Sequence, residues 1–398
     1  MRRKITLLYI DSGGGHRAAA TALIEVLRMQ RRPWDIEMVC IQDILDSVDF
    51  VRRITGIRFQ DVYNIMLRRG WTGGSAHLIR LMHSVIRMSH GSQVEAFRRH
   101  WRRAQPDMVV SLIPHFNRAI KEALDDVWPG VPYVTMLTDM ADYPPNFWIE
   151  RLDQHVICGS VKAAHQARAL GMPAERIFRT SGMILHPRFY EPMAMDRRVE
   201  RARIGMNPDL PTGLVLFGGE GSDEMVKIAR ALGSSKTPVQ LLMLCGKNEK
   251  VAKELRAMNG HPRMFIEGFT RDIPFYMELS DFFIGKPGPG SISEALAKRL
   301  PVIVQRNVWT LAHERYNADW VEEQGTGIVV GSFTREIVDA VNTLLVPGNL
   351  AKFRDRAANT RNKAIFEVPD MLQQVLTQSI HDERTFSAFS AASSAFSA

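Results

Sequence analysis

The chain has 398 residues and a formal net charge of +8, with 45% hydrophobic and 24% charged residues. This composition is ordinary for a globular protein with substantial cores, and the length predicts two or three domains. It argues against a membrane-spanning chain, because no apolar run reaches the roughly 18 residues that a spanning helix needs. The widely separated Cys40, Cys158 and Cys245 predict neither a disulfide framework nor a metal cluster, so we expect a reducing cytoplasm.

The N-terminal segment predicts a strand, a glycine-rich turn and a helix. The apolar run Ile5–Ile10 is shorter than the roughly 7–15 residues of a signal-peptide core, so we interpret it as the first core strand. The turn Asp11–His16 follows, and Ala18–Met29 has helical periodicity. The spacing Gly-x-Gly-x-x-Ala from the turn into the helix matches the dinucleotide fingerprint, which leaves NAD binding as one hypothesis. A histidine at the end of a phosphate-binding turn is unusual, and we expect His16 to point towards a ligand cleft.

The positive charge is concentrated in one segment. Residues 50–105 contain eleven arginines and two acidic residues, and the difference of +9 exceeds the net charge of the whole chain. The segment is also rich in aromatic residues, and we predict an insert of amphipathic helices with Arg68, Arg69, Trp71 and Trp101 as candidate surface residues. A solvated helical face and a nucleic-acid surface are the alternative interpretations, but no recognisable nucleic-acid-binding module is present.

The rest of the first half alternates strand and helix, which predicts a parallel sheet with helices on both faces. Polar residues then fill 196–210 before the same pattern restarts, so we place the interdomain linker near residues 211–213. The predicted domains are residues 1–200, which contain the insert, and residues 201–365. A last helix, Pro369–Ile380, is expected to pack back within 366–384, and the Phe-Ser-Ala repeats of 385–398 predict a disordered tail.

The clearest ligand-binding signal is the stretch Asp281–Val304. Its apolar start predicts a strand, and the alternating prolines and glycines that follow forbid regular structure. Ser291 is a good N-cap and Glu294 completes a capping box with it, so we expect the next helix to begin at Ser291. The free N–H groups and the positive dipole end of such a helix suit a phosphate or pyrophosphate.

Three more turns in the second half follow predicted strands: Gly218–Ser222, Cys245–Asn248 and Gly268–Thr270. The two halves of the chain therefore share one α/β pattern, with a glycine-rich turn in the same topological place in each. This arrangement predicts two doubly wound Rossmann-like domains that face each other across a ligand cleft.

Taken together, these turns resemble the lipid-directed glycosyltransferases of the GT-B fold. The relatives are the monogalactosyldiacylglycerol synthases, the processive diacylglycerol glucosyltransferases and, more distantly, the peptidoglycan N-acetylglucosaminyltransferase, and the resemblance covers about Ile5–Ile380. The motifs that carry it, which are specific in their joint order, are Ser12–Ala18, Thr138-Asp139, Gly218–Gly221, Cys245–Asn248, Gly268–Thr270, Pro287–Ala295 and Asn317.

The resemblance implies a role for each motif. His16 corresponds to the general base that takes the proton from the acceptor hydroxyl, and a neutral imidazole with an ordinary pKa of about 6.5 suits that task. Gly14, Gly15, Asp139 and Trp148 fall on the acceptor side. The donor-side residues that the resemblance implies are Gly219, Glu220, Gly221, Gly246, Lys247, Gly268, Phe269, Gly288, Gly290, Ser291, Glu294, His313, Glu314 and Asn317.

Within this donor set, the resemblance implies that glycines approach the diphosphate and that Gly268 and Phe269 hold uracil through main-chain groups. It also implies that Glu294 accepts hydrogen bonds from ribose hydroxyls, with capping of its own helix as the structural alternative. Charge on the leaving diphosphate would be met by the helix end and main-chain donors, so we expect no metal and no cofactor beyond the UDP-sugar co-substrate. The chain contains no Asp-x-Asp motif.

The segment that reads the donor sugar departs from the relatives. Where they have Gly-Gln-Glu-x-x-Asn, this chain has Ala312–Asn317, with His313 in place of the glutamine and a longer loop before it. The same residues nearly match the zinc motif His-Glu-x-x-His, but the second histidine is absent, so we do not expect zinc.

The resemblance therefore implies an inverting, metal-independent enzyme that moves a hexose from a UDP-sugar to a membrane lipid, with diacylglycerol as the expected acceptor. In relatives the region equivalent to the basic insert meets the membrane, and anionic headgroups attract arginine-rich surfaces. We expect a cytoplasmic protein peripherally associated with the anionic surface of the cytoplasmic membrane, with no nucleic-acid partner and with the oligomeric state left open. The alternatives are another UDP-sugar enzyme on this fold, such as an epimerase or a peptidoglycan-type N-acetylglucosaminyltransferase, and a non-enzymatic basic membrane-binding protein.

Overall fold

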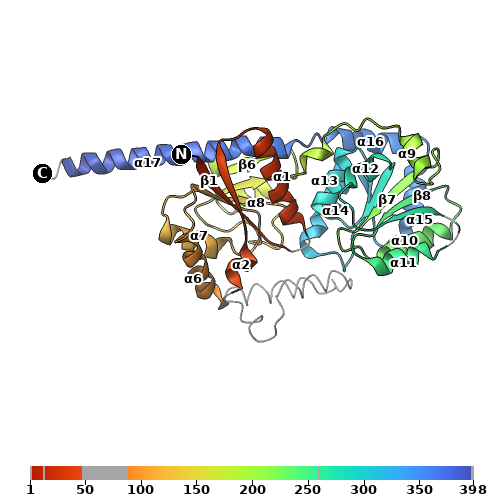
Figure 1. The fold of residues 1–398 in the computed structure, drawn as a ribbon, viewed down its shortest axis with the longest axis horizontal. Helices are drawn as coiled ribbons and strands as arrows, with labels where there is room; N and C mark the ends of the chain where they lie inside the picture. The colour runs from red at the N-terminus through yellow and green to blue at the C-terminus, as the bar shows by residue number, and fades with distance from the viewer. Residues whose placement is uncertain (1, 12–13, 47–87, 259, 261, 396–398) are drawn as a thin grey trace.

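A computed structural model describes the chain except for residues 1, 12–13, 47–87, 259, 261 and 396–398, and over residues 380–395 it describes the main chain alone. Two α/β lobes lie side by side (Figure 1), and each is built on a parallel six-stranded sheet. The predicted pair of doubly wound domains is thereby confirmed.

The N-terminal lobe contains the sheet β2-β1-β3-β4-β5-β6. Its strands are β1 (Arg3–Tyr9), β2 (Trp34–Cys40), β3 (Met108–Ser111), β4 (Tyr133–Met136), β5 (His155–Cys158) and β6 (Ile177–Arg179). Its helices are α1 (Gly15–Met29), α2 (Ile41–Leu45), α6 (His90–Trp101), α7 (Asn117–Val127) and α8 (Val161–Ala169), and η1 (Ala174–Arg176) and η2 (Pro187–Phe189) are short 3-10 helices. The strand order reverses between β1 and β3, and ligands bind at such switch points because the loops diverge there.

The C-terminal lobe contains the sheet β12-β11-β10-β7-β8-β9. Its strands are β7 (Thr212–Leu216), β8 (Gln240–Leu244), β9 (Arg263–Glu267), β10 (Phe282–Gly285), β11 (Val302–Gln305) and β12 (Gly327–Val330). Its helices are α9 (Arg197–Arg203), α10 (Glu224–Gly233), α11 (Glu249–Arg256), α12 (Ile273–Glu278), α13 (Pro289–Ala297), the 3-10 helix η3 (Ala312–Glu314), α14 (Arg315–Gln324), α15 (Phe333–Leu345) and α16 (Asn349–Asn359). This is the strand order of dinucleotide-binding sheets, and its switch point lies between β7 and β10.

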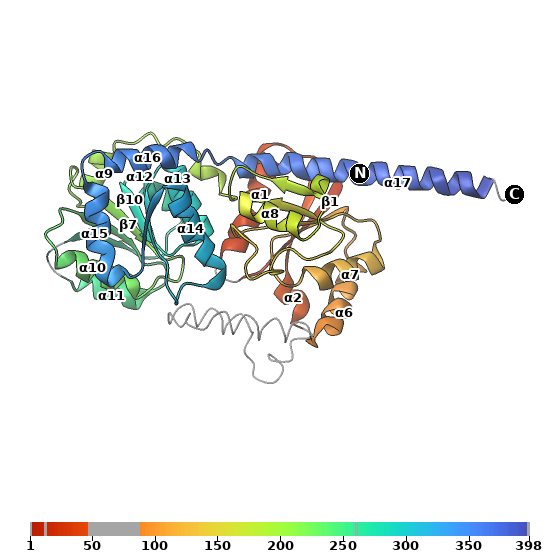
Figure 2. The same cartoon turned by 180° about the vertical axis from the view of Figure 1, so that it is seen from behind.

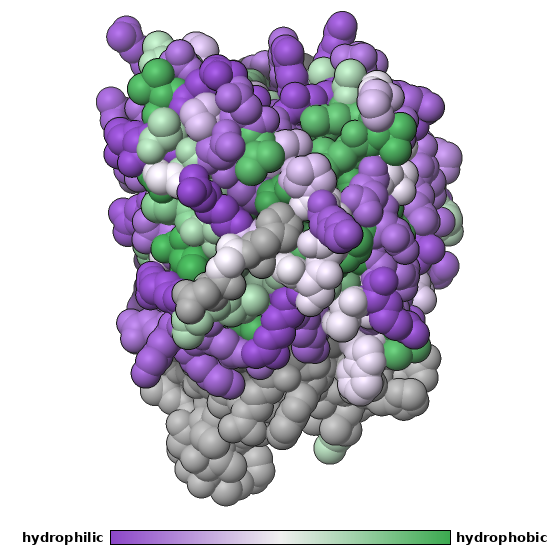
Figure 3. Space-filling model, turned by 90° about the vertical axis from the view of Figure 1, so that its right-hand side faces the viewer, coloured by the Kyte–Doolittle hydropathy of each residue, from purple (hydrophilic) through white to green (hydrophobic). Residues whose placement is uncertain are grey.

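Each sheet is buried on both faces, which explains why its strands are almost continuously apolar. Side chains alternate between the faces: Val215, Phe282 and Ile284 enter one core of the C-terminal lobe, whereas Leu214 and Phe283 enter the other. Figure 3 looks onto the end of this lobe remote from the N-terminal lobe, where hydrophilic side chains prevail and apolar ones occur in small groups. The apolar residues of the C-terminal lobe are therefore concentrated around its sheet.

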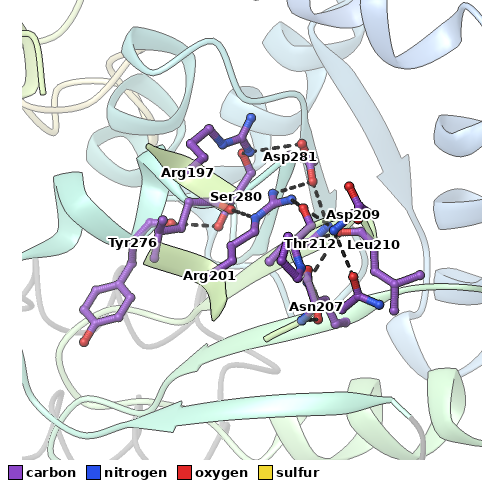
Figure 4. Close-up of polar contacts among 12 residues, drawn as sticks. Arg197, Arg201, Asn207, Asp209, Leu210, Thr212, Tyr276, Ser280 and Asp281 are labelled. Atoms are coloured by element: carbon purple, nitrogen blue, oxygen red, sulfur yellow. Dashed lines mark hydrogen bonds and ion pairs between the residues drawn. The ribbon is translucent and has the colours of Figure 1, made fainter. Parts of the chain in front are cut away.

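The boundary between the lobes precedes the predicted linker. Residue 211 leads directly into β7, and the predicted domain limit at 200/201 falls within α9. Arg197 and Arg201 of α9 donate to the Asp281 carboxylate at 3.0 and 2.7 Å, and the Thr212 main-chain N–H donates to it at 2.8 Å (Figure 4). Arg354 of α16 donates to the same carboxylate at 2.7 Å. The polar residues of 196–210 therefore tie α9 to the base of the C-terminal lobe, and the predicted linker position is wrong.

Helix α17 (Ala364–Ala395) returns to the N-terminal lobe, where Ile365, Val368 and Leu372 pack into the core with α1 and β1. Figure 2 shows the helix continuing past that lobe. It begins five residues before the predicted start and contains Pro369 internally. Its main chain runs as a helix to Ala395, across residues for which the sequence analysis expects disorder. The repeats there contain neither glycine nor proline, and their main chain can therefore be helical.

Of the predicted basic insert, the structure describes residues 88–105. Trp101 is 0% exposed and packs with Val94 and Phe97 in the core beneath α7, so its predicted place at a membrane surface is wrong. The three residues are spaced as one face of α6, and that face is the buried one. Arg68, Arg69 and Trp71 lie outside the described residues. Within the described part of the chain, no helix is long and apolar enough to cross a membrane.

Candidate active site between the lobes

The turns after β7 and β8 pack against each other at the carboxyl edge of the C-terminal sheet. The Lys247 main-chain N–H donates to the Gly219 carbonyl at 2.9 Å. A Cβ on Gly246 would lie 2.3 Å from that carbonyl oxygen, and a Cβ on Gly221 would lie 2.4 Å from the Cys245 carbonyl oxygen. Both glycines also have positive φ, 58° and 62°. Only glycine meets both conditions, so the two turns bring main chain against main chain with no intervening side chain.

A third turn follows β10, on the other side of the switch point. Helix α13 begins at Pro289 with Gly288 as its N-cap, so the predicted N-cap at Ser291 is wrong, and Glu294 lies inside the helix instead of in a capping box. Proline at the first helical position presets φ and lacks an N–H group. Helix geometry leaves the N–H groups of Gly290 and Ser291 without intrahelical acceptors. The physical basis for anion binding is therefore retained, with the N-cap moved by three residues, from Ser291 to Gly288.

A lysine that the sequence analysis missed lies between these turns. Lys286 directly follows β10, and its Nζ donates to Glu314 Oε1 at 2.6 Å. Burial raises the pKa of Glu314, but the charges of Lys286 and His313 outweigh it and leave that pKa below its ordinary value. The position of a cation between a buried strand and a glycine-rich turn is the signal that could have identified Lys286.

Asn317 supports the same turn from beneath. It is fully buried, and its Nδ2 donates to the Pro287 carbonyl at 2.8 Å. Its Oδ1 has no hydrogen-bond partner among the described residues, and its contact with the donor stays a prediction. Its interaction with Pro287 holds the turn that precedes α13.

The remaining donor-side residues line the same sheet edge. Glu294 is half-buried, and its carboxyl group has no hydrogen-bond or ion-pair partner among the described residues. Burial raises its pKa to about 7 against the charge of Arg188. Phe269 is 59% exposed, with Lys247 Nζ 5.8 Å from its ring centre. Lys247 also pairs with Glu220 at 3.6 Å. This edge therefore presents an aromatic ring, an enclosed carboxyl group and bare main chain.

His16 lies at the facing edge of the N-terminal lobe. Helix α1 begins at Gly15, earlier than predicted, with Gly14 as its N-cap at φ 80°, so His16 occupies the first turn of the helix. Its Nδ1 lies 3.1 Å from Thr138 Oγ1. Burial lowers the pKa of His16 to about 4, against a hydrogen bond with the Leu112 main chain. The positive end of α1 acts in the same direction as burial. The imidazole is therefore neutral near pH 7.

The loop of residues 139–149 supports His16. Trp148 lies with its ring centre 5.7 Å from that of His16, and its Nε1 donates to Asp139 Oδ2 at 2.8 Å. Trp148 is 0% exposed, so the predicted acceptor contact is wrong for it, and it packs beneath the imidazole. Asp142 accepts hydrogen bonds from the main-chain N–H groups of Trp148 and Asn146 at 2.7 and 3.1 Å. Burial raises the pKa of Asp142 to about 6 and that of Asp139 above its ordinary value.

The two edges meet through His313 of η3. Its ring stacks on Phe147 of the N-terminal lobe, with 5.7 Å between centres and 14° between planes. The charge of His313 also influences the pKa values of His16 and Asp139. The donor-side segment that departs from the relatives therefore contacts the loop that supports His16. Sequence reasoning missed Phe147 and Asp142, because no local pattern connects them to either His16 or His313.

The site combines a neutral imidazole with main-chain N–H groups and two lysines, Lys286 and Lys247. Within the part of the chain that the structure describes, no group of three or more histidine, cysteine, aspartate or glutamate side chains could hold a metal ion. Such a combination suits a reaction in which a hydroxyl loses a proton while an anionic group leaves.

Comparison with protein families and curated relatives gives a consistent result. Residues 214–375 match the glycosyltransferase family 28 C-terminal domain. A rice protein (Oryza sativa subsp. japonica) described as a probable monogalactosyldiacylglycerol synthase 2 is 28% identical over 345 residues, which cover 82% of this chain and 70% of the rice protein. The spinach (Spinacia oleracea) monogalactosyldiacylglycerol synthase is 26% identical over 403 residues, which cover 95% of this chain and 73% of the spinach protein.

Two solved structures resemble the whole chain. MurG of Acinetobacter baumannii gives a TM-score of 0.61 at 14% identity and covers 94% of this chain and 99% of its own. MnaA of S. aureus, solved with UDP, gives a TM-score of 0.62 at 17% identity. The match covers 94% of this chain and 97% of the MnaA chain. Because the sequence identity to both structures is this low, these similarities are evidence for the fold alone.

Proposed function

We propose that this chain, a glycosyltransferase of the GT-B fold whose second lobe contains a family 28 C-terminal domain, transfers a hexose from a UDP-sugar to a membrane lipid with inversion and without a metal. Diacylglycerol is the acceptor we expect, because the curated relatives are named as monogalactosyldiacylglycerol synthases. The observation that supports the proposal is that the N-terminal end of α13 and the neutral imidazole of His16 lie at the two sheet edges that meet through His313.

The donor is assigned to the carboxyl edge of the C-terminal sheet. Glycine turns flank the switch point between β7 and β10, and the N–H groups of Gly290 and Ser291 suit a diphosphate. We assign uracil to Gly268 and Phe269 and the ribose to Glu294, whose carboxyl group has no partner among the described residues. The S. aureus structure solved with UDP supports a uridine nucleotide on this fold.

The proposed reaction is a single displacement. The acceptor hydroxyl oxygen attacks the anomeric carbon on the face opposite UDP, while the bond between that carbon and the diphosphate oxygen breaks and its electron pair leaves with UDP. The hydroxyl proton passes to Nε2 of His16, because Nδ1 lies against Thr138. The N-terminal end of α13 offsets the charge that develops on the diphosphate. One displacement inverts the anomeric configuration.

We also propose peripheral association with the cytoplasmic membrane. The support is the excess of nine positive charges in residues 50–105, together with the lipid products in the names of the relatives. Each basic residue near an anionic surface contributes about 1 kcal/mol of attraction. The acceptor would then be taken directly from the bilayer.

The test is a transfer assay with UDP-glucose, UDP-galactose and UDP-N-acetylglucosamine, diacylglycerol vesicles and an excess of chelator. We expect a glycolipid from at least one donor, undiminished by the chelator. A water-soluble product formed without vesicles would instead favour an epimerase. Salt-sensitive vesicle binding without affinity for any uridine nucleotide would favour a non-enzymatic membrane protein.

A further inference from the structure

The ion pair between Lys286 and Glu314 occupies the place where the proposed donor diphosphate belongs. Lys286 follows β10 at the switch point, so it lies between the turn after β7 and the turn that starts α13. A Cβ on Gly218 would lie 4.0 Å from Lys286 Cε, and a Cβ on Gly288 would lie 3.5 Å from Cε and 3.9 Å from Nζ. The ammonium group therefore lies beside Gly288, and the end of the lysine stem lies beside Gly218.

The two partners differ in their access to solvent. The Lys286 side chain is 38% exposed, whereas that of Glu314 is 7% exposed. A lysine carries a point charge on a flexible stem and can change partner without moving the main chain. The buried carboxylate cannot follow it, and a buried carboxylate that loses its cation needs other hydrogen-bond donors. His313, which also lowers the pKa of Glu314, remains beside it.

We propose that Lys286 binds the diphosphate of the donor, and that it leaves Glu314 to do so. The exchange frees Glu314 Oε1 to accept hydrogen bonds from the hydroxyl groups of the hexose. Lys286 and Glu314 thus form an ion pair in the empty site and contact two different parts of the donor in the loaded site. This inference rests on the proposed UDP-sugar transfer and names the cation that would stabilise its leaving group.

The exchange has a consequence that distinguishes UDP from UDP-hexose. UDP alone draws the lysine away and leaves Glu314 buried without donors, so part of the attraction is lost. UDP-hexose supplies both the diphosphate for the lysine and the hydroxyl groups for the carboxylate. Uridine has neither a diphosphate nor a hexose, so its affinity should not depend on the ion pair.

The experiment is calorimetric titration of uridine, UDP and a UDP-hexose into the wild-type protein and the variants Lys286→Met, Lys286→Arg and Glu314→Gln. We expect Lys286→Met to weaken the binding of UDP and of UDP-hexose by a similar factor of about tenfold or more, because both ligands lose the same diphosphate contact, with uridine within twofold. Lys286→Arg should retain most of the affinity. Glu314→Gln should bind UDP a few-fold more tightly, because the lysine is no longer held, and its preference for UDP-hexose over UDP should be smaller than that of the wild-type protein.

A matched control is Lys227→Met, which removes a lysine paired with Glu224 at the same 2.6 Å on α10. It should leave all three affinities unchanged. Because Lys286→Met leaves a buried carboxylate unpaired and could impair folding, the double variant Lys286→Met/Glu314→Gln is compared with Glu314→Gln alone and should again lose about tenfold in UDP affinity.

Equal loss of uridine and UDP affinity in Lys286→Met would show a structural role and overturn the inference, as would unchanged UDP affinity in the double variant. Failure of the wild-type protein to bind any of the three ligands would instead overturn the proposed donor site. The two failures are therefore distinguishable in one set of titrations.

Discussion

The two sheet edges that face each other are constructed differently. At the edge of the C-terminal lobe the turns after β7 and β8 pack main chain against main chain, since Gly221 and Gly246 lie against carbonyl oxygens where no side chain fits. Lys286 and the carboxyl groups of Glu294 and Glu314 lie beside these turns. The edge of the N-terminal lobe is formed by side chains, with His16 held over Trp148 by a loop that Asp142 organises. Main-chain N–H groups do not titrate, whereas an imidazole and buried carboxyl groups do. The difference teaches that one lobe is suited to binding an anion and the other to moving a proton.

The largest expected effect comes from removing the imidazole. His16→Ala should lower kcat by about 10²–10⁴-fold, the range for loss of a general base, while the affinity for UDP stays unchanged. Transfer assays and titration of UDP on the same preparation measure both quantities. Turnover equal to that of the wild-type protein would show that His16 is not the base. An equal loss of UDP affinity would show that His16 of the N-terminal lobe also contributes to donor binding.

The corresponding variant in the C-terminal lobe is Gly246→Ala, in the turn after β8. Its Cβ would meet the Gly219 carbonyl oxygen at 2.3 Å with φ at 58°, so one of the two turns must move. We expect a loss of about 1–3 kcal/mol in the free energy of unfolding and at least a tenfold loss in UDP affinity. Denaturant unfolding and titration measure these changes.

The matched control is Gly91→Ala at the start of α6, where a Cβ meets nothing within 4 Å. That variant should be as stable as the wild-type protein or slightly more stable. If Gly246→Ala behaved in the same way, the bare main chain of the donor-side turns would have no role.

An intermediate effect is expected from the loop that supports His16. Asp142→Asn replaces the carboxylate that accepts the N–H groups of Asn146 and Trp148, so Trp148 would lose part of its support. We expect kcat to fall about tenfold, in proportion to one or two weakened hydrogen bonds, with UDP affinity unchanged. Asp153→Asn, an exposed aspartate of the same lobe, should change neither. A change in UDP affinity alone would contradict the division between the lobes.

The smallest effect concerns the titration of Glu294. Its pKa is raised from 4.5 to about 7, so the carboxyl group is neutral below pH 7 and ionised above it, where it can accept hydrogen bonds from ribose. Uridine carries no phosphate that titrates in this range. Its affinity should therefore rise a few-fold, roughly 3–10-fold, between pH 6 and pH 8, and Glu294→Gln should abolish this dependence. Uridine affinity that stays flat in the wild-type protein would exclude Glu294 from the ribose site.

The difference between the two sheet edges also explains which parts of the site the sequence could predict. Glycine turns after apolar strands are local patterns. They predicted the doubly wound fold and the glycine-rich main chain at the carboxyl edge of the C-terminal sheet. The predicted N-cap of α13 at Ser291 was wrong because the helix begins earlier, with Pro289 at the first helical position, where proline is favoured. The burial of Trp101 was available from its spacing to Val94 and Phe97, but the surrounding arginines were given more weight.

The side-chain edge was less accessible to sequence reasoning. The local pattern singled out His16, but its role as base and the inclusion of Asp139 came from a family resemblance. Nothing local indicates that Phe147 stacks on His313 of the other lobe. Lys286 lies next to a predicted turn, yet its partner Glu314 is on a different element. Contacts between residues so far apart in the chain depend on how the sheets are placed, and single-sequence patterns carry no information about that placement.

The most direct test of the division between the lobes is a crystal structure with a UDP-hexose bound. We expect the diphosphate at the N–H groups of Gly290 and Ser291, the uracil beside Phe269, and the anomeric carbon facing His16 across the space between the lobes. A nucleotide bound at the N-terminal lobe, or a hexose turned away from His16, would contradict the proposed transfer.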